Sequence, residues 1–210
     1  MTDQRRHWDA LYTRDPARRL AADPSPLAAE CAALLAPGSL VLELGCGAGR
    51  DAAFFARAGH TVCATDFSTV ALAVNRRREL SPPRLHYVAL DTAAPLPFTD
   101  ATFAAVYARL SLHYFGDAVT RRVFREIRRV LRPDGLLCFL CKSIDDPLYG
   151  RGRQIEADMF ELDGHVRHFF SADYARACLD DVFQVVVIES GRETFHEGPS
   201  AFVKVVARAV

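Results

Sequence analysis

The chain lacks an excess of charge of either sign. Lysine plus arginine and aspartate plus glutamate both number 26 among 210 residues, so the formal net charge is zero with neutral histidines. This balance argues against a general binder of nucleic acids or of membrane surfaces, whose partners are polyanions. Half of the residues are apolar, which argues against disorder over most of the length and provides for a full α/β core.

Long apolar runs are also missing. No stretch reaches the roughly 20 residues that span a bilayer, and the polar residues 1–6 do not lead into the apolar core of a signal peptide. We therefore expect a cytoplasmic protein without a membrane partner. Internal repeats and low-complexity segments are absent as well, and the length predicts one domain over residues 1–210.

A cysteine arrangement suited to a metal site is missing, although the chain has six cysteines. Of six cysteines, only Cys138 and Cys141 form a C-x-x-C pair, and they lie in an apolar run that reads as a strand. Side chains three positions apart on a strand point to opposite faces. No second pair completes a tetrahedral zinc site. We expect reduced thiols in the core and no metal.

Strand and helix patterns alternate along most of the chain. We expect strands at about 39–44, 60–65, 84–89, 103–109 and 136–142, with helices at about 50–58, 69–80 and 117–132 and a turn at 133–135. This order predicts an α/β fold with a mostly parallel sheet and helices on both faces.

The two ends of the chain depart from this alternation. Residues 1–37 hold two expected N-terminal helices, at about 3–12 and 25–36. Near the other end, expected strands at 182–189 and 201–207 are separated by residues 191–199, too few for a crossover helix. We therefore expect an antiparallel pair at one sheet edge.

The most informative segment is residues 41–49, Val-Leu-Glu-Leu-Gly-Cys-Gly-Ala-Gly. Glycine permits positive φ and lets a ligand approach the backbone closely. Dinucleotide folds use G-x-G-x-x-G, whereas here the spacing is G-x-G-x-G and position 50 is arginine, so the ligand need not carry a pyrophosphate. The second strand ends at Asp66, whose carboxylate can accept two hydrogen bonds from a ribose diol. The alternative is a plain glycine turn in another nucleotide fold.

These residues resemble motif I and the acidic second-strand motif of the class I S-adenosylmethionine-dependent methyltransferases. Residues 96–103 and 130–135 are typical of the branch that acts on small molecules, although Ala104 stands where many relatives carry an acid. The resemblance implies a single Rossmann-like domain with seven strands, the last two forming a hairpin. It also implies S-adenosylmethionine as cofactor and S-adenosylhomocysteine as product.

The resemblance further implies a cofactor site at the ends of the first four strands. Glu43 would position the methionine ammonium or the loop, and Asp66 would bind the ribose. Guanidinium groups pair with carboxylates in a fork, so Arg109 suits the methionine carboxylate, with Arg50 as a competitor. Trp8 is a candidate to close the site or only to anchor its helix on the core. The other candidates are Gly45, Cys46 and Gly47 through their backbone, Phe67, Asp91 and Thr92 around the adenine, Leu110 beside the methionine, and Tyr12 as a second closing residue.

Residues 143–170 follow the fifth expected strand and are rich in polar side chains, so we expect a substrate-side insert or lid there. Within it, His165, Arg167 and His168 are similar in position and type to the His-Arg pair of tellurite-resistance-type methyltransferases. His113, just after the fourth strand, is a further candidate. Methyl transfer needs alignment above all, and a general base only where the nucleophile must lose a proton. These four residues are the candidate catalytic residues; the alternative is that they are polar surface residues.

The expected function is therefore methyl transfer to a small polar or anionic acceptor. A stripe of arginines on the 117–132 helix offers a second interpretation, a peptide or RNA substrate, but no aromatic residues interleave with it, so nucleic acid is disfavoured. Further alternatives are a non-catalytic S-adenosylmethionine-binding module and an NAD-dependent oxidoreductase.

Overall fold

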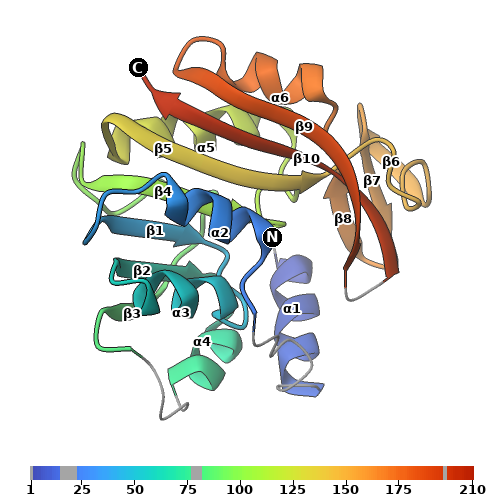
Figure 1. Cartoon of the computed structure of the whole chain (residues 1–210). Coiled ribbons are helices and arrows are strands. Elements are labelled where there is room, and N and C mark those ends of the chain that lie inside the picture. The colour runs from blue at the N-terminus through green and yellow to red at the C-terminus, as the bar shows by residue number, and fades with distance from the viewer. Residues whose placement is uncertain (1, 15–22, 77–81, 196–197) are drawn as a thin grey trace.

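The computed structural model of the chain describes residues 2–14, 23–76, 82–195 and 198–210 (Figure 1). The described elements are, in chain order, α1 (Thr2–Arg14), α2 (Pro26–Ala33), β1 (Leu40–Leu44), α3 (Arg50–Arg57), β2 (Thr61–Asp66), α4 (Thr69–Arg76), β3 (Leu85–Ala89), β4 (Phe103–Arg109), α5 (Asp117–Val130), β5 (Leu131–Lys142), β6 (Arg153–Glu156), β7 (Met159–Leu162), β8 (His165–His168), α6 (Ala172–Leu179), β9 (Phe183–Phe195) and β10 (Gly198–Ala209).

The central sheet has seven strands in the order β3-β2-β1-β4-β5-β10-β9. The first five are parallel to their neighbours, while β10 runs antiparallel to β5 and β9 antiparallel to β10. The predicted fold class is thereby confirmed, including the antiparallel pair at one edge. Successive strands extend from β1 in one direction and from β4 in the other. In open α/β sheets, ligands bind beyond the carboxyl ends of the strands at such a switch point.

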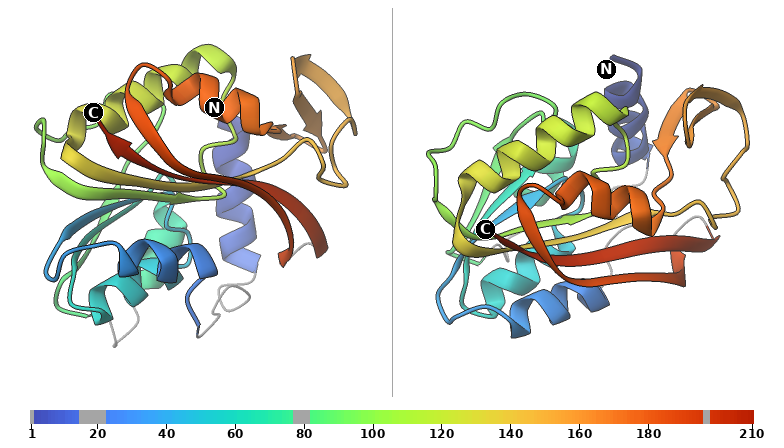
Figure 2. Two further views of the ribbon diagram at one scale, coloured as in Figure 1. Left: turned by 45° about the horizontal axis from the view of Figure 1, so that its top comes forward. Right: turned by 90° about the horizontal axis from the view of Figure 1, so that it is seen from above.

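Helices cover both faces of this sheet (Figure 2). One apolar layer lies between the sheet and helices α5 and α6, and the other lies under α2, α3 and α4. The amphipathic pattern of α5 buries Val123, Phe124 and Ile127 in the first layer. Cys138 belongs to one layer and Cys141 to the other, so their side chains lie on opposite faces, as the strand period predicts.

Two helices start at serine caps. The Ser25 hydroxyl accepts a hydrogen bond from the Ala28 amide at 3.2 Å, with Pro26 at the first position of α2. Ser171 caps α6 in the same way through the Tyr174 amide at 3.0 Å. The helix predicted over 69–80 is described as far as Arg76, and residues 77–80 lie outside the described part of the chain.

The helix predicted over 117–132 ends two residues earlier in the structure, and the strand after it begins earlier than predicted. α5 ends at Val130, and β5 starts at Leu131 rather than at 136. Residues 133–135 form an irregularity inside β5, where Asp134 has a φ of 59° and the register against β4 shifts between Phe103 and Ala105. The turn chemistry is therefore present, but the ladder continues across it.

The last hairpin is longer than predicted, because residues 191–195 continue β9 and residues 198–200 begin β10. Gly191 pairs with Phe202, whose ring atom Cζ would lie 2.6 Å from a Cβ at that position. The glycine thus serves close packing inside a strand rather than a loop. This extension carries the hairpin past the end of β5, toward the carboxyl edge of the sheet (Figure 1).

The segment 143–170, expected as an insert, contains a separate three-stranded antiparallel sheet, β6-β7-β8. Its last strand lies beside α1, and the Gln4 side-chain amide donates to the Val166 carbonyl at 3.1 Å. α1 also packs against α4 on its other side, where the Ser68 hydroxyl donates to Asp9 at 2.6 Å. α1 therefore bridges the main sheet and the insert. None of the described helices combines the length and apolar character needed to cross a membrane.

Candidate active site

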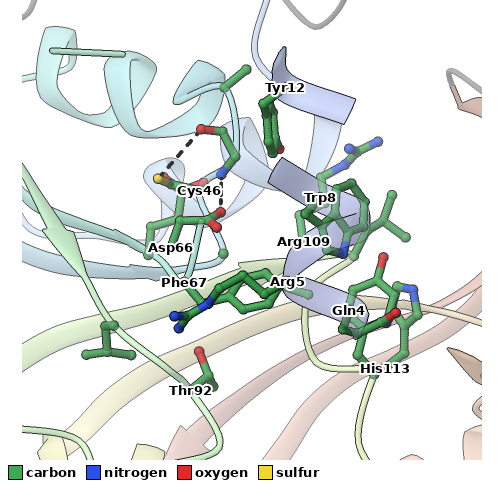
Figure 3. Close-up of a pocket in the computed structure, with 18 of the residues that line it drawn as sticks. Gln4, Arg5, Trp8, Tyr12, Cys46, Asp66, Phe67, Thr92, Arg109 and His113 are labelled. Carbon is green, nitrogen blue, oxygen red and sulfur yellow. Dashed lines mark hydrogen bonds between the residues drawn. The ribbon is translucent and has the colours of Figure 1, made fainter. Parts of the chain in front are cut away.

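A cavity of about 440 Å³ lies at the carboxyl ends of the parallel strands. Figure 3 shows α1 along one side of it, with Trp8 and Tyr12 projecting toward Cys46, Asp66 and Arg109. All predicted cofactor residues line this cavity: Tyr12, Glu43, Gly45, Cys46, Gly47, Arg50, Asp66, Phe67, Asp91, Thr92, Arg109 and Leu110. Three of the four candidate catalytic residues, His113, His165 and Arg167, line it as well, and His168 does not.

The glycine loop is built so that only glycine fits. Gly45 and Gly47 have φ values of 76° and 51°. A Cβ on Gly45 would lie 2.4 Å from the Ser111 Cβ, and one on Gly47 would lie 2.4 Å from the Tyr12 hydroxyl. Ser111 is itself fixed, because its hydroxyl donates to the Leu44 carbonyl at 2.6 Å. The two glycines therefore let the loop backbone pass close to the Ser111 and Tyr12 side chains and leave it without side chains of its own at these positions.

Asp66 braces the same loop. One carboxylate oxygen accepts from the Gly47 amide at 2.8 Å and the other from the Ser68 amide at 2.9 Å. Burial raises the pKa of Asp66 above its ordinary value, against these hydrogen bonds, which lower it. Each carboxylate oxygen still has a lone pair that can accept a further hydrogen bond from a ligand.

Glu43 is a buried acid whose Oε2 has no hydrogen-bond partner among the described residues. Burial, followed by the negative charges of Asp51 and Asp66, raises the pKa of Glu43 well above its ordinary value. Arg50 acts in the opposite direction, but its guanidinium is paired with Asp51 at 3.1 Å. An acid in this situation favours a cationic ligand beside it, because the ligand offsets the cost of ionising the carboxyl group.

Strand β4 delivers Arg109 and Leu110 to the cavity wall. Leu110 adopts the left-handed conformation, with φ of 56°, and its amide donates to the Leu140 carbonyl at 2.7 Å. The Arg109 guanidinium lies 3.6 Å from a carboxylate oxygen of Glu193 and 4.8 Å from the centre of the Phe195 ring. Both partners come from β9, so the long hairpin helps to position this arginine.

His113 stands out at the other end of the cavity. Its side chain is fully buried, and neither ring nitrogen has a hydrogen-bond partner among the described residues. Burial, then the positive charges of Lys142 and Arg167 and the rings of His165 and His168, lowers the pKa of His113 well below its ordinary value. The imidazole is therefore neutral at pH 7.

His165 and Arg167 come from β8, where an offset of two residues puts both side chains on the cavity face. The His165 ring packs against His7 at a centroid distance of 4.3 Å, and against Trp8 and Tyr114 at 5.5 and 5.3 Å. Aromatic rings from α1, β8 and the β4–α5 loop thus form one wall.

His168 lies on the other face of β8, which corrects its prediction as a residue of the site. Its Nδ1 lies 3.0 Å from the Phe115 carbonyl oxygen, and its ring packs against Phe170 and Tyr174. An offset of three from His165 reverses the direction of a strand side chain, so the two histidines cannot share one cavity. Burial lowers the pKa of His168, against the hydrogen bond to Phe115 and nearby acids.

Sequence reasoning missed several cavity residues, above all Lys142, Ser111 and Phe195. Lys142 was detectable as the polar residue that ends an apolar strand beside the switch point. Phe195 was not, because it falls in the segment 191–199 that the pattern assigns to a loop.

The chain is similar in sequence and in fold to known methyltransferases. Residues 41–135 match the family model of a methyltransferase domain. The chain is 34% identical over 142 residues to a malonyl-[acyl-carrier protein] O-methyltransferase of Enterobacter lignolyticus. The aligned region covers 68% of this chain and 47% of that protein. The chain spans about half the length of the curated relatives it matches.

Solved structures with the same fold include a SAM-dependent methyltransferase of Methanosarcina mazei, with a TM-score of 0.75 and 19% identity, covering 90% of this chain and 99% of that one. Another is the 1,6-didemethyltoxoflavin-N1-methyltransferase of Burkholderia thailandensis, which contains S-adenosylhomocysteine. It gives a TM-score of 0.74 at 24% identity and covers 100% of this chain and 88% of that one. At these identities the likeness establishes the fold.

Proposed function

Because the chain belongs to the class I S-adenosylmethionine-dependent methyltransferases, we propose that it transfers the methyl group of this cofactor to a small polar or anionic acceptor. The proposal rests on one cavity whose two ends are lined by chemically different residues. At one end stand the glycine loop and three buried acids, Glu43, Asp51 and Asp66, and at the other a buried imidazole without a hydrogen-bond partner among the described residues.

The residues at the first end fit the cofactor. Gly45 and Gly47 carry no side chains, so an adenosyl group can approach the loop backbone closely between Ser111 and Tyr12, and Asp66 accepts the ribose hydroxyls. The buried Glu43 carboxyl, one oxygen of which has no hydrogen-bond partner among the described residues, favours a ligand that carries positive charge. When bound, the cofactor supplies an electrophilic methyl group on a sulfonium. Arg109 is proposed to hold its methionine carboxylate, with Leu110 beside it and Phe67, Asp91 and Thr92 around the adenine.

The remaining residues align the acceptor and exclude water. Trp8 and Tyr12 cover the cavity from α1, while His165 and Arg167 on the insert contact the acceptor, which makes residues 143–170 a lid. Neutral His113 accepts the proton of an acceptor hydroxyl or amine as its bond to the methyl carbon forms. Charge is conserved, since the sulfonium becomes a neutral thioether and the imidazole gains the positive charge before it releases the proton to water.

A small acceptor is favoured over a macromolecule by two observations. One of the proteins named above is called an N1-methyltransferase of 1,6-didemethyltoxoflavin, and its structure holds that free acceptor. In addition, several arginines of α5 hold internal partners: Arg121 pairs with Asp117, Arg129 with Glu126 and Asp100, and Arg128 donates to the Val210 carbonyl. These arginines therefore bind groups within the chain itself, which gives less support to a role of the α5 arginines in binding a macromolecule.

Ligand-dependent thermal unfolding tests the proposal. We expect S-adenosylmethionine and S-adenosylhomocysteine each to raise the Tm, by an amount that grows with ligand concentration, and NAD to leave it unchanged. An acceptor panel, with S-adenosylhomocysteine release as the signal, then tests turnover. Stabilisation by NAD would contradict our interpretation of the glycine spacing. Stabilisation by S-adenosylhomocysteine with no turnover across the panel would favour a non-catalytic binding module.

A further inference from the structure

Lys142 ends β5 inside the cavity, and it is one of only two lysines in the chain, the other being Lys204. Its side chain is buried, with 8% of its surface exposed. A buried ammonium group is costly unless it is paired and hydrogen-bonded. Nearly all other basic residues of the chain are arginines, so a lysine at this buried position is unusual for this sequence.

The ammonium is held by a buried network. Lys142 donates to Asp146 Oδ2 at 2.9 Å and to the Ser200 hydroxyl at 2.7 Å, and that hydroxyl donates to the same Asp146 oxygen. Asp146 also accepts from the backbone amides of Ala201 at 3.1 Å and Leu148 at 3.0 Å. Burial acts to raise the pKa of Asp146, but these hydrogen bonds outweigh it and lower the pKa. The carboxylate is thus ionised and fixed in place.

This network accounts for two of the three N–H bonds of the Lys142 ammonium, and within the described part of the chain the third N–H bond is left for a further acceptor atom. The Nζ atom lies 5.9 Å from the centre of the Phe195 ring, which shields one side. A group fixed by neighbours and carrying one remaining donor is prepared for a ligand, because little further ordering is needed on binding.

The position of Lys142 indicates what that ligand is. A second cavity of about 450 Å³ adjoins the first, and Lys142, His165, Arg167 and Phe195 line both. The acids that line the first cavity, Glu43, Asp51, Asp66 and Asp91, all come from the β1–β3 half of the chain. The wall between the cavities therefore presents two buried cations and an imidazole.

We propose that the acceptor carries an oxyanion group, such as a carboxylate or a phosphate, and that the Lys142 ammonium binds it where the two cavities adjoin. This inference rests on the proposed function, and it names the acceptor class. The oxyanion docks on Lys142 beside Arg167, the body of the acceptor lies in the first cavity, and its nucleophile faces His113. Asp146 and Ser200 are positioning residues that act through Lys142.

The anion also affects proton transfer to His113. The positive charges of Lys142 and Arg167 disfavour a protonated His113. A bound oxyanion neutralises part of this charge, so it makes the imidazole a better proton acceptor at the moment the acceptor is in place.

Trp8, the only tryptophan of the chain, lines the first cavity and serves as a fluorescent reporter. We would first titrate S-adenosylhomocysteine, and then titrate 4-hydroxybenzoate, phenyl phosphate and the neutral analogue 4-hydroxybenzamide, with and without S-adenosylhomocysteine. A charge-assisted hydrogen bond corresponds to roughly tenfold in affinity. We therefore expect the unsubstituted chain to bind the two oxyanions about tenfold more tightly than the amide.

The matched variants are Lys142→Met and Lys204→Met. Lys204 is also ion-paired, to Glu30 and Glu189, but it lies outside both cavities. We expect Lys142→Met to abolish the preference for oxyanions and Lys204→Met to keep it. Ser200→Ala, which retains the charge pair, should weaken oxyanion binding about threefold through loss of one neutral hydrogen bond, and it serves as the test if Lys142→Met does not fold.

Several outcomes would overturn the inference. They are equal affinities for 4-hydroxybenzoate and 4-hydroxybenzamide, a preference for oxyanions that survives Lys142→Met, or no oxyanion binding at all. A parallel loss of S-adenosylhomocysteine affinity in Lys142→Met would place this lysine in the cofactor site instead. Failure of the unsubstituted chain to bind S-adenosylhomocysteine refutes the proposed function separately, since oxyanion binding is also measured without it.

Discussion

The two ends of the cavity are assembled in different ways. The central part of the proposed cofactor end, Glu43 to Asp66, comes from one β-loop-α-β unit and uses backbone atoms and buried acids. The acceptor end collects His113, Lys142, Arg167 and Phe195 from four segments that the topology brings together. A backbone cradle depends on local conformation, whereas a set of distant side chains depends on how the whole sheet and its insert pack. The first is therefore readable from a short motif, and the second only from the fold.

The two ends also differ in which charged form burial disfavours, a carboxylate at one end and an imidazolium at the other. Burial raises the pKa of Glu43 and Asp66 at one end and lowers the pKa of His113 at the other. In each case the folded chain disfavours the charged form. A cationic ligand beside the acids, or an anionic one beside His113, offsets that cost. The cavity is thus prepared for two ligands of opposite charge.

The largest effect is expected from Gly45→Ala at the cofactor end. The left-handed backbone costs an alanine about 1–2 kcal/mol, and the Cβ would also lie 2.4 Å from the Ser111 Cβ, which cannot easily move. Gly38→Ala is the matched control, because Gly38 has a φ of 74° and nothing within 4 Å of the added Cβ. We expect Gly45→Ala to exceed the control in lost unfolding free energy by about 1–3 kcal/mol, and to lose most S-adenosylhomocysteine binding by calorimetry. Retained affinity would mean that the loop is not the cofactor floor.

A smaller effect is expected from Asp66→Ala. We expect S-adenosylhomocysteine affinity to fall by roughly 1–3 kcal/mol, because the ribose hydroxyls lose a charged acceptor. The loss also includes the Gly47 amide, which gives up its 2.8 Å hydrogen bond to this carboxylate. Binding of 4-hydroxybenzoate, followed through Trp8 fluorescence without cofactor, should stay unchanged. Equal losses for both ligands would show that the two ends are not separate sites.

The sequence predicted that the residues of the proposed cofactor end lie together, because their positions depend on local chemistry. Glycines at alternate positions and an acid ending the next strand place Gly45, Gly47 and Asp66 in one cavity without knowledge of the sheet order. His113, which directly follows the fourth strand, was found for the same reason.

The acceptor end was predicted less completely because it depends on strand register. His168 was included because it is a neighbour of Arg167 in sequence, yet the two-residue strand period turns it to the far face of β8. Phe195 reaches the cavity only because the hairpin continues past Gly191, a residue whose local preference is for a turn. Side-chain direction in short strands is set by pairing partners, which the local pattern does not contain.

The smallest effect concerns His113 and the pH dependence of folding. Its pKa lies below the ordinary value in the folded chain, so below pH 6.5 the unfolded chain binds a proton that the folded chain rejects, and stability falls as the pH decreases. His113→Leu removes this proton linkage in a site where neither ring nitrogen has a partner among the described residues. Its unfolding free energy should therefore fall less between pH 7.5 and 5.5, by at most about 1.4 kcal/mol, the limit for one such group over this range. His86→Leu, which removes an exposed imidazole from β3, is the control for the loss of a histidine elsewhere in the chain. An unchanged slope in His113→Leu would mean that the buried imidazole takes up a proton in the folded state, and the acceptor end would then hold a charged histidine among its cations rather than a neutral proton acceptor.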